Sequence, residues 1–252
     1  MTNAPPSIAL RVAWSLALWA LVALLLYLTF ATVHYNWNWP RAWAYRHQFF
    51  IGWLTTLAIS ACAMVCSIVI GFILMLGRRS PWEPVRLLAS GIVEVLRGSP
   101  LLVQLLVGYY IIATAVHVTS PLVVGTILLG CFHGTYLAEV FRGAVESIGA
   151  SQREAARAVG FDSVQTYRYV IIPQGIRRAV PATTGQLVSL IKDSSLLSVI
   201  AIEELFLKVK ILTSGTYTAL EGYLAMAAAY LLVTLPLSWY ARRLERRFAF
   251  ET

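Results

Sequence analysis

The stretch Glu154–Pro173, EAARAVGFDSVQTYRYVIIP, places charged side chains within an otherwise apolar chain. Of the 252 residues, 58% are hydrophobic and only 13% are charged. Soluble domains carry about a quarter charged residues. The mean hydropathy is +0.70, and long apolar runs recur on both sides of the stretch. The composition therefore indicates an integral membrane protein, in which this stretch belongs to a polar loop.

Six segments are apolar and close to the ~20 residues that a helix needs to cross a bilayer. The predicted spans are Ala9–Val33, Gly52–Leu76, Ser99–Val116, Leu122–Phe141, Ala182–Ile202 and Ala219–Tyr240. A helix satisfies its own backbone polar groups, as the bilayer interior requires. The predicted fold class is an all-α integral membrane protein with about six transmembrane helices.

Positive charges between the spans predict the orientation. With the N-terminus inside, fourteen Lys and Arg residues fall in inside segments and four in outside segments. Lys and Arg are retained on the cytoplasmic side of a membrane. Both termini and the long loop Arg142–Pro181 are therefore predicted to be cytoplasmic. The basic residues behind the net charge of +8 cluster between the apolar runs, where they set the topology, so no nucleic-acid partner is expected.

Local signals within that loop predict two short helices. The segment SQRE, Ser151–Glu154, is typical of a capping box, and EAARAV is a strong helix-forming run. Gly160 falls where a left-handed residue would end the first helix, and DSVQ, Asp162–Gln165, predicts the start of the second. Pro173 and Gly175 are expected to break the chain after the second helix. The alanine-rich first helix favours docking of another protein over an amphipathic hairpin on lipid.

The loop resembles the EAA loop of ATP-binding-cassette (ABC) importer permeases, whose pattern is EAA, three residues, Gly, nine residues and Ile-x-Leu-Pro. Glu154, Ala155, Ala156, Gly160 and Pro173 match it. Val170 and Ile172 depart mildly, as apolar replacements for Ile and Leu. Three more motifs are similar to the polar amino-acid branch of that family: VEVLRGSPLLVQ (Val93–Gln104), GTYLAEVFRGAVESI (Gly134–Ile148) and LIKDSSLLSVIAIEEL (Leu190–Leu205).

This resemblance implies a domain plan. Residues 1–49 would form an N-terminal transmembrane helix with an outward-facing loop, and residues 244–252 a cytoplasmic tail. Residues 50–243 would form a five-helix permease domain that contains the cytoplasmic EAA loop, 142–181. The implied location is a bacterial inner membrane, with multiple passes.

The resemblance also implies a function: a permease subunit that brings a polar amino acid into the cytoplasm. The implied partners are cytoplasmic ABC ATPase subunits, a second permease that is identical or similar, and an extracytoplasmic solute-binding protein. The positions implied to dock the ATPase are Glu154, Ala155, Ala156 and Gly160. Phe161 and Asp162 are added because they flank the joint between the two predicted helices.

The residues themselves do not predict an enzyme. The chain has no G-x-x-x-x-G-K-[ST] phosphate loop, so ATP and Mg would bind to the partner ATPase, and no cofactor or metal is expected on this chain. Cys62, Cys66 and Cys131 lie in apolar runs, which favours a packing role. His133 lies within a span, where a hydrogen-bonded packing role is favoured over a functional one.

The fifth predicted span carries Lys192 and Asp193. Nine Leu, Ile and Val residues between 183 and 202 favour insertion by about 3–5 kcal/mol, but the two charges oppose it by roughly 5–7 kcal/mol at the bilayer centre. This helix should therefore face protein or a water-filled path. Adjacent residues pair poorly along a helix, so each charge is expected to find another partner. The candidate partners are Glu139 and Arg97.

A substrate path is the second prediction. The stretch around RGSP, Arg97–Pro100, is too long for one span, so either a broken helix lines the path or a turn joins an interfacial helix to the third span. Arg97 or Lys192 would bind a substrate carboxylate, and Asp193 or Glu139 its ammonium group. A structural ion-pair network is the alternative. The path residues are predicted as Arg97, Gln104, Glu139, Lys192, Asp193, Ser194 and Ser195.

Two other classes of protein remain open at this point. A secondary transporter driven by an ion gradient predicts internal repeats, and no convincing similarity links the two halves. A structural membrane subunit of a larger complex is the third class.

Overall fold

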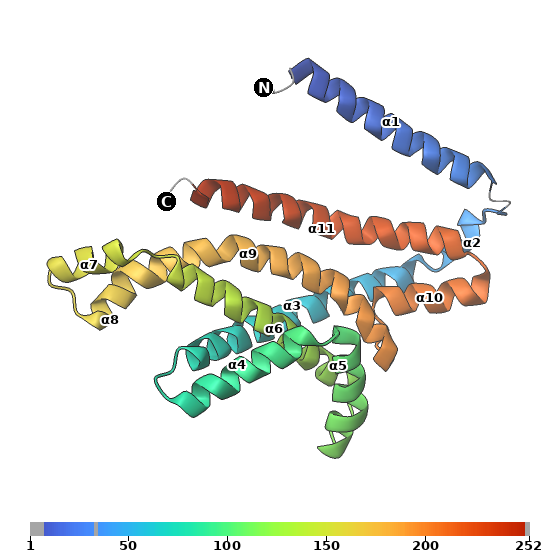
Figure 1. Cartoon of the computed structure of the whole chain (residues 1–252). Coiled ribbons are helices and arrows are strands. Elements are labelled where there is room, and N and C mark those ends of the chain that lie inside the picture. The colour runs from blue at the N-terminus through green and yellow to red at the C-terminus, as the bar shows by residue number, and fades with distance from the viewer. Residues whose placement is uncertain (1–7, 33–34, 250–252) are drawn as a thin grey trace. The chain divides into compact units, whose positions relative to one another are not determined.

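A computed structural model describes residues 8–32 and 35–249, and every regular element in these residues is a helix (Figure 1). The chain divides into two units, Met1–Asn38 and Trp39–Thr252. The first unit contains α1. The second contains, in chain order, α2 (Trp39–Ala44), α3 (Arg46–Arg78), α4 (Glu83–Gly98), α5 (Leu101–Val107), η1 (Gly108–Ala113), α6 (Pro121–Glu146), α7 (Ala150–Ala158), α8 (Ser163–Thr166), η2 (Tyr167–Ile171), α9 (Ile172–Asp193), η3 (Ser194–Ile200), α10 (Leu205–Thr216) and α11 (Ala219–Ala249).

The all-α class is confirmed, and the number of spans follows from helix length and composition. Four described helices are long and apolar enough to cross a membrane, namely α1, α3, α6 and α11. The pair α4 and α5–η1, bent by 109°, makes a fifth if it is counted as one span. The predicted span Ala182–Ile202 is divided between the end of α9 and the 3₁₀ helix η3, and neither element is among the described helices that qualify.

The helix α1 runs over Ile8–Thr32, close to the predicted first span, whose last residue, Val33, lies outside the described residues. Its apolar side chains are exposed around the whole circumference, including Trp14, Trp19 and Tyr27. A helix that is apolar on every side is suited to a lipid environment.

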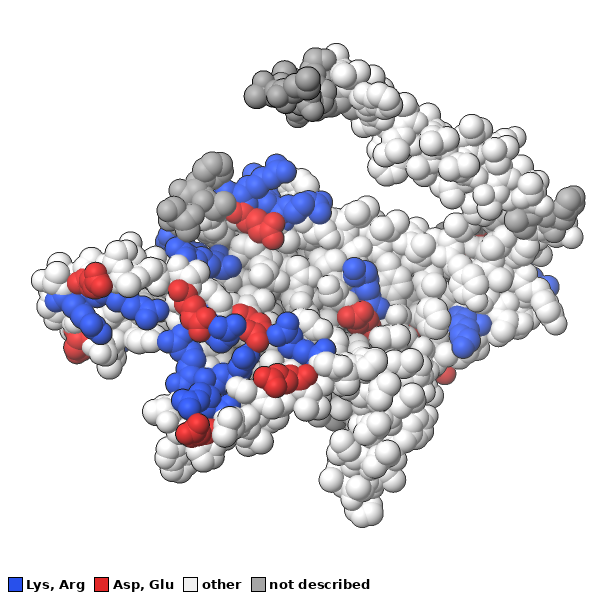
Figure 2. Space-filling view, viewed as in Figure 1, with Lys and Arg blue, Asp and Glu red and all other residues white. Residues whose placement is uncertain are grey.

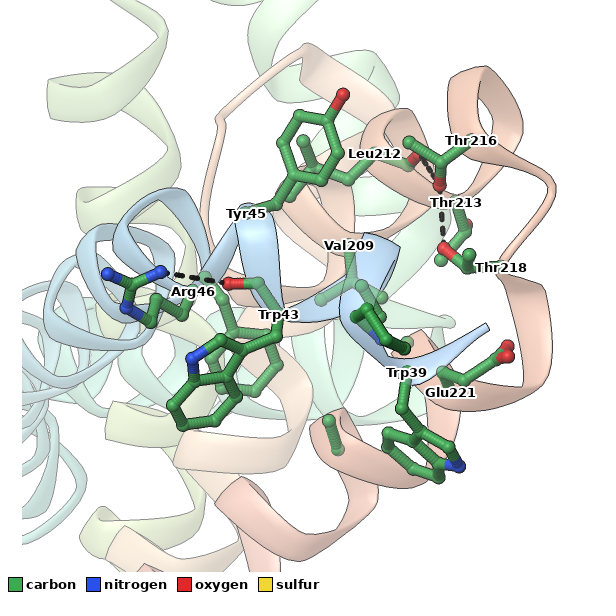
Figure 3. A pocket seen from close by; sticks show the side chains of 15 residues that line it. Trp39, Trp43, Tyr45, Arg46, Val209, Leu212, Thr213, Thr216, Thr218 and Glu221 are labelled. Carbon is green, nitrogen blue, oxygen red and sulfur yellow. Dashed lines mark hydrogen bonds between the residues drawn. The ribbon is translucent and has the colours of Figure 1, made fainter. Parts of the chain in front are cut away.

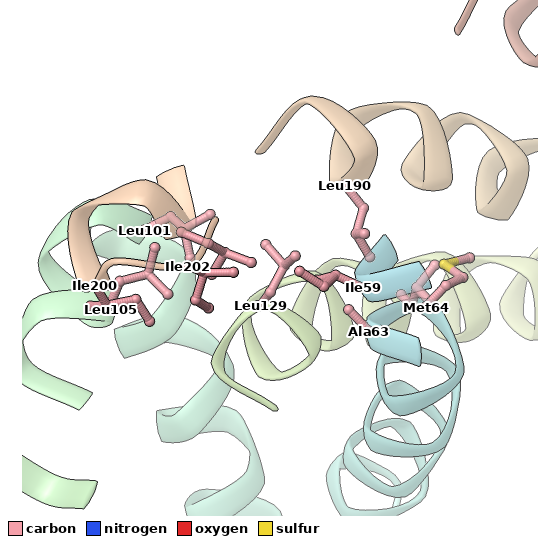
Figure 4. Close-up of a cluster of buried hydrophobic side chains, with 11 residues drawn as sticks. Ile59, Ala63, Met64, Leu101, Leu105, Leu129, Leu190, Ile200 and Ile202 are labelled. Carbon is pink, nitrogen blue, oxygen red and sulfur yellow. The ribbon is translucent and has the colours of Figure 1, made fainter. Parts of the chain in front are cut away.

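The most extensive helix packing in the second unit joins α3 and α6, and glycines lie at this contact. A Cβ atom added at Gly71 would lie 2.8 Å from the carbonyl oxygen of Gly134, and one added at Gly130 would lie 2.7 Å from Cys66 Cβ. Small residues allow two membrane helices to approach at backbone distance. Beside this contact, α3, α5, α6, α9 and η3 contribute buried side chains to one core, which includes Ile59, Leu105, Leu129, Leu190 and Ile200 (Figure 4).

The stretch around RGSP is broken, as its length predicts. The helix α4 ends at Gly98, and α5 begins at Leu101 after Ser99 and Pro100 in extended conformations. The Gln104 side chain stabilises this corner, because its Nε2 donates to the carbonyl oxygens of Leu96 (2.6 Å) and Ser99 (3.1 Å). The break is thus a turn between two helices rather than an unwound stretch.

The helices on either side of the loop are longer than predicted. The helix α6 continues to Glu146, and α9 already begins at Ile172, so the predicted loop limits Arg142 and Pro181 lie inside helices. Pro173 does not interrupt the chain: α8, the π helix η2 and α9 follow one another without a gap, and Pro173 comes just after η2, where the Ile172 N–H still bonds to the carbonyl of Tyr167 five residues earlier. Residues 244–249, expected as a tail, continue α11.

Candidate functional site

The loop forms the predicted first helix, α7, and the predicted joint at Gly160, but the second helix, α8, is not a separate short helix, because it runs without a gap into η2 and α9. Gly160 has φ +85°, the region that only glycine occupies without strain. The Phe161 N–H donates to the carbonyl of Ala156 (3.0 Å) and the Gly160 N–H to that of Arg157 (2.9 Å), which together form a Schellman motif. The sequence therefore predicted the joint correctly.

Only one of the two predicted helix starts carries a side-chain cap. The Asp162 carboxylate and the Gln165 side chain cap the start of α8 reciprocally. At α7 the predicted capping box does not form: the helix begins two residues earlier, with Gly149 as N-cap and no side-chain cap, so Ser151 lies within its first turn. The chain enters α7 directly from the turn after α6, and the last residue of that turn, Gly149, takes the cap position.

The α7–α8 pair presents a small, partly apolar surface. Glu154 and Ala155 are exposed, whereas Ala156 is buried, with 4% of its surface accessible. Val159 and Val164 flank the joint and are 72% and 74% exposed. Of the six predicted docking positions, Glu154, Ala155, Gly160 and Asp162 are exposed, Phe161 is half-buried beside Tyr169, and Ala156 packs inside the pair.

Three contacts brace this region against the long helices. Arg153 of α7 donates to the carbonyl oxygen of Val145 in α6 (3.5 Å). The Arg79 guanidinium, just beyond α3, donates to the Tyr167 hydroxyl in η2, the segment that follows α8 without a gap (3.1 Å). Arg178 of α9 donates to the carbonyl oxygen of Ser147, just beyond α6 (2.6 Å). The helix pair is therefore connected to α6 through Arg153 and to α9 through the unbroken run of α8, η2 and α9.

Charged side chains gather toward the α7–α8 end of the face shown in Figure 2. One cluster centres on Glu139 of α6, whose carboxylate pairs with Arg78 of α3, with Arg97 of α4 (3.1 Å) and with Arg142 of α6 (2.7 Å). The Arg97 guanidinium also lies over the Tyr136 ring, 5.0 Å from its centroid. One carboxylate thus joins three helices and leaves the cluster with excess positive charge.

The predicted pairing of Lys192 and Asp193 with Glu139 and Arg97 is wrong. Glu139 and Arg97 pair with each other. Asp193, whose side chain is 38% exposed, instead faces the buried ring of His133 on α6, with 3.3 Å between Oδ2 and Nε2. Lys192 is exposed. No local pattern could reveal His133 as the partner, because the contact joins α6 to the end of α9, 60 positions later.

The other predicted path residues use their polar groups within the fold. Ser194 is fully buried and donates to the carbonyl of Ile191, and Ser195 donates to that of Lys192. Gln104 is engaged at the α4–α5 corner. The charged candidates lie in two places. Arg97 pairs with Glu139, whereas Lys192 and Asp193 lie at the end of α9.

A cavity of about 520 Å³ lies at the opposite end of the unit, between α2, α10 and α11 (Figure 3). Its wall is mainly apolar and includes Trp39, Trp43, Val209 and Leu212. None of the predicted path residues lines it. Tyr45 adds a third aromatic side chain to this wall, and Trp and Tyr are the residues enriched at membrane–water interfaces.

The chain matches the family described as "Binding-protein-dependent transport system inner membrane component" over residues 67–250. It is 35% identical to the Escherichia coli (strain K12) glutamine transport system permease protein GlnP over 212 residues, 83% of this chain and 97% of that protein. It is 32% identical to the Bacillus subtilis (strain 168) probable glutamine ABC transporter permease protein GlnM over 196 residues, 78% of this chain and 91% of that protein.

The solved structures agree. A crystal structure of an amino acid ABC transporter with histidines matches with a TM-score of 0.79 and 32% identity, covering 84% of this chain and 100% of that one. An inward-facing MetNI methionine ABC transporter shares the fold, with a TM-score of 0.65 over 80% of this chain and 98% of that one, at 18% identity. These matches reject the secondary-transporter alternative. The chain belongs to the family of binding-protein-dependent transport system inner membrane components, the permease subunits of ABC importers.

Proposed function

We propose that the chain carries a polar amino acid into the cytoplasm as one permease of an importer driven by a separate ATPase. The names of the relatives support the substrate class, since GlnP and GlnM are named for glutamine and a similar solved structure is an amino acid transporter. The observation that carries the proposal is the α7–α8 pair. It is capped at its joint, exposed at its tip and connected to the long helices α6 and α9.

The ATPase is proposed to dock on α7–α8. Glu154 and Ala155 offer an exposed carboxylate beside a small side chain, and Val159 and Val164 offer apolar contacts. Because Arg153 of α7 bonds to α6, and α8 runs without a gap through η2 into α9, closure of an ATPase dimer would move these helices as rigid bodies. ATP and Mg belong to that partner.

The orientation is proposed from charge. The α7–α8 end would be cytoplasmic, together with both termini, because fourteen of the Lys and Arg residues fall in segments on that side. The opposite end, with α2 and α10, would receive substrate from an extracytoplasmic binding protein. The membrane would be a bacterial inner membrane, and a second permease, identical or similar, would complete the path.

The substrate path is proposed to use the two charged groups separately. Asp193 would bind the ammonium group of the amino acid, and Arg97, which retains donors beyond its pair with Glu139, would bind the carboxylate. Lys192 is the second cationic candidate. Ser194, Ser195 and Gln104 would shape the path without contacting substrate, since their polar groups are occupied by backbone carbonyls.

Co-purification and uptake test this function together. The permease is expressed with its ATPase and isolated, and the amount of bound ATPase is compared between wild type and Glu154→Arg. The variant is expected to lose the ATPase while the permease stays folded. Arg157→Glu, a charge reversal on the same helix, is the control. It tests whether loss of the ATPase depends on the position of Glu154 or follows from any charge reversal on α7.

Uptake is then measured in proteoliposomes that contain the whole complex and radiolabelled L-amino acids. ATP inside is expected to drive uptake, and Asp193→Asn is expected to raise KM. Uptake driven by a sodium or proton gradient without the ATPase would overturn the proposal. An unchanged KM in Asp193→Asn would reject the substrate role of Asp193.

A further inference from the structure

His133 is a fully enclosed imidazole that bridges two turns of α9. Its side chain is 1% exposed, and its Nδ1 atom lies 2.6 Å from Gln186 Nε2. Its Nε2 atom lies 3.3 Å from Asp193 Oδ2. Gln186 and Asp193 are seven residues apart, which is two helical turns, so they share one face of α9. One ring on α6 therefore contacts both groups on that face.

The two contacts fix the position of the ring proton. The Gln186 amide nitrogen can only donate, so Nδ1 accepts, and a neutral imidazole then carries its proton on Nε2. The Asp193 carboxylate lies 3.3 Å from Nε2, on the side of the ring that carries this proton. With the Gln186 amide reversed, a neutral ring would place its Nε2 lone pair against the carboxylate, which is repulsive. The carboxylate and the amide therefore select the same tautomer.

Asp193 also provides the nearest hydrogen-bond acceptor for the Nε2 proton. Nε2 is buried, and it has no hydrogen-bond partner of good geometry among the described residues. Asp193 Oδ2, at 3.3 Å, is the acceptor within reach. A buried donor without an acceptor is destabilising, so a hydrogen bond from Nε2 to Asp193 Oδ2, at a slightly shorter distance, is favoured.

We propose that His133 is a positioning residue for transport: it donates its Nε2 proton to Asp193 and holds the carboxylate so that the second oxygen binds the ammonium group of the substrate. This inference rests on the proposed function of Asp193. The Gln186 side chain fixes the tautomer, and His133 acts through Asp193 without contacting the substrate. A packing role alone would predict no selective effect on substrate binding.

Two substitutions separate the two contacts of the ring. The amide nitrogen of Gln occupies nearly the place of Nε2, so His133→Gln keeps the donor to Asp193. The shorter side chain of Asn reaches only the place of Nδ1, so His133→Asn keeps the Gln186 contact and loses the Asp193 contact. Both variants are polar and of similar size, so they perturb the α6–α9 packing similarly.

The experiment measures KM and kcat for uptake of radiolabelled L-amino acids by the whole complex in proteoliposomes. His133→Asn is expected to raise KM roughly tenfold with kcat within about twofold, as loss of one hydrogen bond to a charged group predicts. His133→Gln is expected to keep KM within about twofold of wild type. Gel filtration of each complex shows whether assembly is intact.

Equal KM values for the Asn and Gln variants would overturn the inference, as would loss of assembly in both, which makes His133 a packing residue. Asp193→Asn distinguishes the two proposals. A raised KM in Asp193→Asn with no difference between the two His133 variants rejects the role of His133 alone. An unchanged KM in Asp193→Asn rejects the substrate role of Asp193, and the inference about His133 with it.

Discussion

Asp162 and Gln165 cap each other at the start of α8. The Gln165 N–H donates to Asp162 Oδ1 at 2.8 Å, and the Asp162 N–H donates to Gln165 Oε1 at 2.9 Å. Because Asp162 follows Gly160 by two residues, the end of α7 and the start of α8 are fixed within one short segment. The rigidity of the helix pair thus depends on local hydrogen bonds at its joint.

Asp162→Ala should loosen α8. Loss of a capping side chain costs about 1 kcal/mol, which corresponds to roughly fivefold faster exchange of the protected amides in the first turn. Hydrogen exchange at Gln165 and Thr166 measures it. Ser151→Ala is the matched control, because Ser151 caps no helix and its substitution should leave exchange in α7 unchanged. Equal effects of the two substitutions would contradict the capping assignment.

Gly160→Ala should strain the joint. A left-handed conformation costs a residue with a side chain about 1–2 kcal/mol, so the docking-competent arrangement becomes less populated and less ATPase is retained on co-purification. Gly160→Asn should be milder, since Asn tolerates positive φ. Gly143→Ala in α6 is the control: a Cβ atom there meets nothing within 4 Å, so binding should be unchanged. An unaffected Gly160→Ala complex would show that the joint is not needed for docking.

Glu139→Gln should destabilise the permease more than Glu146→Gln. The Glu139 carboxylate is 23% exposed and pairs with three arginines, so its removal leaves like charges together and costs about 1–3 kcal/mol. Glu146 is 49% exposed and pairs with Arg142 one turn away, a contact worth about 0.3–0.5 kcal/mol. The apparent Tm of each variant in detergent, followed by intrinsic fluorescence, ranks the two. A larger shift for Glu146→Gln would rule out Glu139 as the centre of the cluster.

Gly71→Ala should separate α3 from α6. The added Cβ would lie 2.8 Å from the Gly134 carbonyl oxygen and from Leu137 Cβ, and a core overpacked by one methyl group loses about 1–3 kcal/mol. Gly91→Ala in α4 meets nothing within 4 Å and should be neutral or slightly stabilising, because alanine favours helix. Thermal unfolding of both variants in detergent checks the difference, and a stable Gly71→Ala protein would show that the α3–α6 contact can relax.

Local sequence signals predicted the features that depend on nearest neighbours along the chain. Gly160 and the Asp162–Gln165 box were predicted correctly because each needs only a few consecutive residues. The Ser151 box failed because the same local pattern fits two helix starts, and the turn after α6 selects the earlier one. Pro173 was misinterpreted because the helix continues past it: the π helix η2 immediately before it changes the backbone hydrogen-bond spacing, and no local pattern indicates that change.

The sequence by itself determined that this protein is helical and spans a membrane, that a capped helix pair interrupts its apolar runs, and which family it resembles. These properties follow from composition and from spacing along the chain. Only the tertiary structure decided the partners of the charges: Glu139 binds three arginines, and Asp193 faces His133. A charge within a membrane protein must find a partner, but helix packing, through contacts such as that of Gly71 with Gly134, decides which partner comes within reach.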